Sequence, residues 1–106
     1  MSVPRGTTPT FTLTFPQDAE LDLCQARGVY VSFRSGGKTL TKAAGDDGVN
    51  VEQDKIHVWL NQEETLLFYA GTIMIQANWT TADGQRAASE IVSCQITENL
   101  LPKVVE

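Results

Sequence analysis

The regular alternation of apolar and polar residues constrains the fold of this chain more than any other feature. Residues 10–15, 28–34 and 56–60 each carry an apolar side chain at every second position. A period of two places those side chains on one face of a β-strand and leaves the other face polar. Four further segments are expected as strands: 38–43, 49–52, 72–82 and 85–97. The alternation therefore predicts an all-β protein, an antiparallel β-sandwich of about seven strands.

Glycine-containing turns connect several of these strands. Gly36 and Gly37 can supply the positive φ angles of a two-residue hairpin. Asp83-Gly84 predicts a type I′ hairpin, which fixes a register for the last two strands. The pairs expected from that register are Ala82 with Gln85, Trp79 with Ala88, Ile75 with Val92, and Ile73 with Cys94. A bulge in so long a hairpin would shift this register.

The two faces of this last hairpin differ in character. The face expected in the core collects Ile73, Ile75, Val92, Cys94 and Ile96. The reverse face mixes Met74 and Ile91 with polar residues. We therefore count Met74 and Ile91 as candidate interaction-surface residues.

One short helical turn is expected near residues 61–67, where the alternation stops. Asn61 can cap its first turn, and Glu64 can complete a capping box. Such a turn would carry the chain from one sheet to the other, with Leu66 or Phe68 closing the end of the sandwich. Another helical turn is expected around residues 19–23, inside a loop.

Length and charge indicate one domain without a nucleic-acid or membrane partner. The 106 residues suit a single domain, with residues 1–8 as a loose N-terminal arm and 99–106 as a C-terminal tail. The net charge is -5 and the basic residues are scattered, which argues against a nucleic-acid backbone as partner. No apolar run approaches a membrane span, and the first residues lack a secretory apolar region. A distant cysteine pair can bridge the two sheets of an immunoglobulin-type sandwich. We expect synthesis in the cytoplasm, which favours Cys24 and Cys94 as reduced thiols over such a disulfide.

Catalytic and metal-binding patterns are weak. His57 lies out of phase with the core residues, and no motif marks a nucleophile beside it. The acidic residues between 46 and 54 do not have the spacing of a calcium loop. We therefore expect no catalytic residue, no metal, no cofactor and no enzymatic activity.

Two aromatic residues suggest an alternative function. Trp59 is out of phase with Val58 and Leu60, so it should face outward, and Tyr30 is the one aromatic that could join it. An outward tryptophan can lie under a loop, anchor a protein interface or stack on a sugar. The alternative function is a small ligand-binding module, for example for a host-surface carbohydrate.

Several segments in order resemble a family of short prophage proteins from Gram-positive bacteria. They are residues 5–10, residues 29–33 followed by Gly37-Lys38, residues 60–66 with Phe68 and Gly71, Ile75-Gln76, Asp83-Gly84 and residues 88–91. These proteins are similar to the immunoglobulin-like N-terminal domain of phage baseplate upper proteins. Because the sequence ends at Glu106, we expect a small tail-associated subunit without the long C-terminal extension of those proteins.

The resemblance implies an immunoglobulin-like β-sandwich that serves as a structural element of a phage tail. It implies other tail or baseplate proteins as partners, and a location in the virion tail after assembly. Because tail components form repeated symmetric contacts, we also expect a homo-oligomer. The candidate interaction surface comprises Arg5, Thr7, Tyr30, Trp59, Met74 and Ile91.

Overall fold

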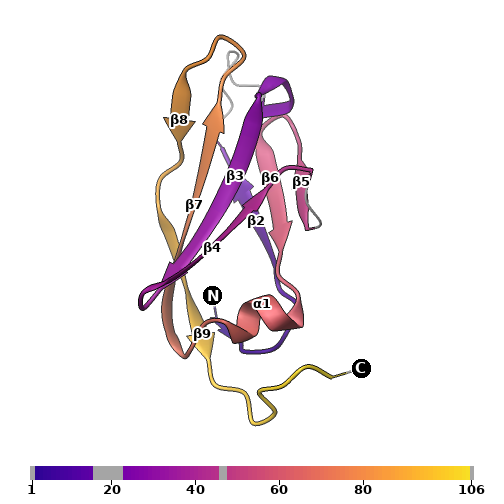
Figure 1. The fold of residues 1–106 in the computed structure, drawn as a ribbon, viewed down its shortest axis with the longest axis vertical. Helices are drawn as coiled ribbons and strands as arrows, with labels where there is room; N and C mark the ends of the chain where they lie inside the picture. Colours follow the sequence, from indigo (N-terminus) through magenta and orange to yellow (C-terminus); the bar gives the residue numbers. More distant parts are fainter. Residues whose placement is uncertain (1, 16–22, 46–47, 106) are drawn as a thin grey trace.

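Two β-sheets face each other in the computed structural model, which describes residues 2–15, 23–45 and 48–105 (Figure 1). In the larger sheet the neighbouring strands are, in order, β1 (Ser2–Pro4), β9 (Val92–Thr97), β7 (Gly71–Thr80), β3 (Gly28–Ser35) and β4 (Lys38–Ala43). A short strand, β8 (Arg86–Ala88), also pairs with β7. The smaller sheet has the order β2 (Thr10–Thr14), β6 (Lys55–Trp59) and β5 (Val49–Val51).

This strand order is that of an immunoglobulin-like sandwich. If β2 is strand B, then β3, β4, β5, β6, β7 and β9 are strands C, C′, D, E, F and G. The two sheets then read B–E–D and C′–C–F–G, which is the immunoglobulin arrangement, with no strand A beside strand B in the described part of the chain. The predicted fold class is confirmed. The pairing is antiparallel throughout the described strands except between β1 and β9.

The core forms between the sheets from the residues at alternate positions. Val31 and Phe33 of β3, and Ile56 and Val58 of β6, are completely buried. The rings of Phe11 and Phe33 meet across the sandwich with centroids 5.7 Å apart. Burying an aliphatic or aromatic side chain of this size contributes roughly 1.5–3 kcal/mol. The burial of these alternate apolar side chains is therefore the main source of stability.

The N-terminal residues are not a loose arm. Residues 2–4 form β1, which pairs in parallel with Gln95–Thr97 of β9, and Val3 is buried. The expected arm was wrong because a three-residue strand is too short to show a period, and its partner lies at the other end of the chain.

Local sequence signals predicted the helix and the first hairpin correctly. The helix α1 (Gln62–Leu66) joins β6 to β7, and Asn61 and Glu64 form the predicted capping box. Phe68, rather than Leu66, is the residue fully buried at that end of the sandwich. Gly36 and Gly37 have φ angles of 57° and 91°, which confirms the predicted two-residue turn. The helical turn expected at 19–23 lies mostly outside the described residues. Within them, a 3-10 turn spans Leu23–Gln25.

The turn of the last hairpin differs from the prediction. A type I′ turn needs a positive φ at both central residues, but Asp83 has a negative φ and only Gly84, with φ 93°, is positive. The Thr81 N–H donates to the Gln85 carbonyl at 2.7 Å. The loop is therefore three residues long, and Ala82 does not pair with Gln85.

One extra residue lies between β8 and β9. Trp79 pairs with Ala87 rather than Ala88, whereas Ile75 pairs with Val92 and Ile73 with Cys94, as predicted. The Ser89 hydroxyl accepts the Ala77 N–H at 2.9 Å, where a regular ladder would supply a carbonyl. Such a bulge bends its strand. On the expected core face, Ile73, Ile75, Cys94 and Ile96 are buried but Val92 is 43% exposed.

Candidate functional site

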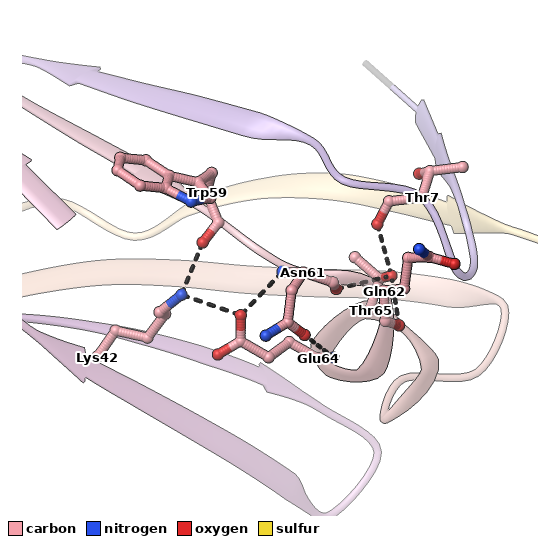
Figure 2. A network of polar contacts seen from close by, with 7 residues as sticks. All are labelled: Thr7, Lys42, Trp59, Asn61, Gln62, Glu64 and Thr65. Carbon is pink, nitrogen blue, oxygen red and sulfur yellow. Dashed lines mark hydrogen bonds and ion pairs between the residues drawn. The ribbon is translucent and has the colours of Figure 1, made fainter. Parts of the chain in front are cut away.

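The end of the sandwich that carries α1 is closed by a polar network (Figure 2). Lys42 of β4 is buried, and its Nζ donates to the Trp59 carbonyl at 2.7 Å and to Glu64 Oε1 at 2.9 Å. Glu64 Oε1 also accepts the Asn61 N–H at 2.9 Å. The buried ammonium is therefore paired with a carboxylate and a carbonyl, which is the condition for keeping a charge inside a fold.

Arg5 and Thr7, predicted as surface contacts, belong to this closed end. The Arg5 guanidinium donates to the Phe68 and Leu66 carbonyls at 2.8 and 3.0 Å. These carbonyls lie at the end of α1, where the last helical residues have no partner within the helix. The Thr7 carbonyl accepts the Thr65 hydroxyl at 2.8 Å. Both residues thus hold the N-terminal segment against α1.

Tyr69 is an exposed residue that the sequence analysis missed. Tyr69 is 66% exposed, and the Arg5 guanidinium and the Lys38 ammonium lie 4.7 Å and 5.4 Å from the centroid of its ring. Tyr69 directly follows Phe68, which was expected to close the end of the sandwich, and this position could have indicated that Tyr69 faces outward.

Trp59 and Tyr30 lie on opposite outer faces of the sandwich. Trp59 is 40% exposed on the β2–β6–β5 sheet, and Tyr30 is exposed on β3 in the other sheet. Because the core separates the two faces, the two aromatic rings do not form one sugar platform. Met74 on β7 and Ile91 just before β9 are exposed, as predicted.

His57 lies in a polar row across the smaller sheet. Its Nδ1 is 3.0 Å from the Thr12 hydroxyl, and its Nε2 contacts Glu52. The hydrogen bond from His57 lowers the pKa of the Glu52 carboxyl below its usual value. All three residues lie on the outer face, and such cross-strand rows are common on solvated sheets. Among the described residues, no group of three or more potential ligands could hold a metal ion.

A groove opens along the side of the sandwich where β2 faces β8 and β9. Its volume is about 580 Å³. Its apolar lining includes Leu13, Phe15, Ile75, Trp79 and Val92. The Phe15 and Trp79 rings meet edge to face at 5.3 Å, which forms part of its floor. Ser89 and Glu90, at the bulge, line the groove too.

The β2 edge of this groove carries unpaired backbone groups. Phe15 N–H donates to Asp54, and the Pro9 carbonyl accepts from Leu60, so odd-numbered residues direct their backbone groups to β6. Strand geometry then directs the N–H and C=O of Thr10, Thr12 and Thr14 to the open side. In the described part of the chain, β2 pairs with β6 alone. This edge is a template for an added strand.

The two cysteines are not joined by a disulfide. Cys94 packs in β9, as expected for a small apolar residue, and its side chain lines the groove. Burial raises the pKa of the Cys94 thiol. Cys24 is exposed on the 3-10 turn, with its Sγ 4.0 Å from the Val51 carbonyl oxygen.

Comparisons with known proteins place the chain in no family. No family model matches it, and no curated protein matches it. The solved structure of murine CRIg is similar over 93% of this chain and 91% of that chain, with 8% identity and a TM-score of 0.47. The immunoglobulin-like fold is assigned from the strand order of the two sheets. No described helix is long and apolar enough to cross a membrane.

Proposed function

We propose that the protein is a non-enzymatic structural subunit of a phage tail or baseplate that acts through protein–protein contacts. The observation that carries the proposal is the groove, where an unpaired strand edge and apolar side chains are accessible together. Proteins commonly bind other chains at such edges, because main-chain hydrogen bonds supply affinity and alternate side chains supply specificity.

The assignment to a phage tail is supported by the sequence resemblance. Its most specific segment, residues 60–66, comprises Leu60, the helix cap Asn61 and the whole of α1 (Gln62–Leu66). The polar residues around this segment are bonded within the fold. The groove and the outer faces are therefore the surfaces left for partners.

Co-purification with phage tail proteins tests this function. The tagged chain is co-expressed with tail and baseplate proteins of a phage of Gram-positive bacteria. Val92→Lys places a charge in the groove at a half-exposed position, and Thr97→Lys places the same charge on the outer face of β9 as a control. We expect capture of a tail protein by the wild type and by Thr97→Lys, and loss of capture by Val92→Lys.

Capture of no tail protein by the wild type would contradict the proposal. A glycan array tests the alternative function, which is carbohydrate binding. A structural subunit should bind none of the glycans, and saturable binding abolished by Trp59→Ala would favour a carbohydrate-binding module instead.

A further inference from the structure

We propose that the groove takes the C-terminal tail of a second copy of this chain as an added β-strand beside β2. The inserted segment is residues 100–105, called the tail strand below. This inference rests on the proposed function, since it names one partner surface for an assembly subunit.

The tail strand is an apolar segment without a core of its own. Leu100 is fully exposed, and Leu101, Val104 and Val105 are between 43% and 51% exposed. The tail crosses the α1 end of the sandwich, where the Gln62 side chain exchanges two hydrogen bonds of 2.8 Å with the Val105 backbone. The Asn99 side chain donates to the Arg5 carbonyl at 2.7 Å. These few polar contacts leave most of its apolar surface in water.

The length of the tail strand matches the free edge. Six extended residues span roughly 20 Å at ~3.3 Å each, enough to cover a five-residue strand. If Leu100, Pro102 and Val104 enter the groove, all three groove-facing residues are apolar, and Lys103 faces outward together with Leu101 and Val105.

Pro102 fixes the direction of the tail strand. In an antiparallel pair, residues opposite each other share a face. The free backbone groups of β2 belong to Thr10, Thr12 and Thr14, whose side chains face outward. An antiparallel tail strand would therefore bond to β2 through its own outward-facing residues, Leu101, Lys103 and Val105. The nitrogen of Pro102, which carries no hydrogen, would then point away from β2, as proline requires at a sheet edge.

The same proline argues for a second copy. The tail leaves β9 at the α1 end, which is also where β2 begins (Figure 1). If the tail folded back directly into its own groove, it would run parallel to β2. In a parallel pair the groove-facing residues bond to β2, so Pro102 would lack a needed N–H. To run antiparallel, the tail would first have to reach the far end of β2. Residues 98 and 99 span only about 7 Å.

One tail and one groove on every copy make the contact head-to-tail. Such contacts close into rings or continue as open chains, and two copies can also exchange tails reciprocally. Association is therefore expected to increase with protein concentration.

Light scattering after size-exclusion chromatography, over a concentration series of the full chain, tests the proposal. We expect the wild type to associate. Leu100→Ser with Val104→Ser removes the two aliphatic side chains that face the groove and should raise the dissociation constant at least about tenfold. Leu101→Ser with Val105→Ser is the matched control, with the same chemical change at outward-facing positions, and should associate like the wild type.

A mixing experiment identifies the groove as the acceptor. Val92→Lys blocks the groove but keeps the tail, whereas the Leu100/Val104 double variant keeps the groove but lacks a functional tail. Each alone should be monomeric. Their mixture should form a 1:1 complex and nothing larger, because one groove and one tail remain.

A monomeric wild type at every concentration would overturn the inference. Equal loss of association in both double variants, or a mixture that stays monomeric, would overturn it as well. Capture of phage tail proteins by a monomeric wild type would still support the proposed function. Failure of the inference is thereby distinguishable from failure of the function.

Discussion

Lys42 illustrates how much a single buried charge depends on its partners. Its ammonium reaches both the Trp59 carbonyl and Glu64 from inside the sandwich, with its side chain 8% exposed. Replacing it by methionine keeps most of the apolar stem but removes the positive charge that pairs with the Glu64 carboxylate. We expect Lys42→Met to reduce the free energy of unfolding by about 2–4 kcal/mol, measured by urea denaturation.

Lys103→Met is the matched control for Lys42→Met, because Lys103 lies in the exposed tail. It should change the free energy of unfolding by no more than about 0.5 kcal/mol. Equal urea midpoints for the two variants would contradict the role of Lys42. The double variant Lys42→Met with Glu64→Gln should lose less than the sum of the single losses, since the two residues interact directly.

Glu52 makes stability depend on pH. Its pKa is lower in the folded protein, chiefly because of the hydrogen bond with His57. The stabilisation is therefore present above the unfolded pKa of 4.5 and is lost as the pH falls through the lower folded value. We expect Glu52→Gln to lower the urea midpoint more at about pH 6 than at about pH 3. Glu98→Gln, which removes an exposed carboxylate outside this row, is the control. If Glu52→Gln lowered the urea midpoint equally at both pH values, the Glu52 carboxylate would not be the source of the pH dependence.

Among the elements, the last hairpin depends on the backbone of Gly84. A Cβ at this position would have space, since Arg27 Nη1 would lie 3.8 Å from it, so only the φ of 93° opposes a side chain. We expect Gly84→Ala to cost about 1–2 kcal/mol of unfolding free energy, measured by thermal or urea denaturation. Gly84→Asn should cost less, because asparagine tolerates this conformation better. Equal losses for the two variants would show that φ is not the cause.

The elements that the sequence predicted are those determined locally. The capping box needs only Asn61 and Glu64, and the first hairpin needs only Gly36 and Gly37. The β8–β9 bulge was not located, since it depends on Ser89 meeting Ala77 across the sheet. β1 was missed for the same reason, because its pairing with β9 is visible only in three dimensions.

The candidate site was the least predictable part. Among the described residues no strand pairs with the open edge of β2, next to which Val92 is exposed, and a sequence pattern does not show which edge stays uncovered. Of the predicted surface residues, Arg5 and Thr7 serve the closed end, whereas Tyr30, Trp59, Met74 and Ile91 are exposed on different parts of the surface. Alternation assigns a residue to a face but not to a shared site.

At the scale of the whole molecule, association should be visible in backbone amide exchange. The N–H groups of Thr12 and Thr14 point to the open side of β2, so they should exchange rapidly in a monomer. Under associating conditions we expect protection of these two amides, measured by NMR or mass spectrometry. The amides of Leu13 and Phe15 point to β6 and serve as internal controls. Protection of β5 without β2 would indicate a different contact surface.

The parallel pairing of β1 with β9 has a consequence for biosynthesis. Residues 2–4 leave the ribosome well before their partners, residues 95–97, are made. Since domains fold as their segments emerge, Val3 cannot be buried beside β9 until β9 has been synthesised. The sheet is therefore completed at its β1 edge only after residues 95–97 have been translated.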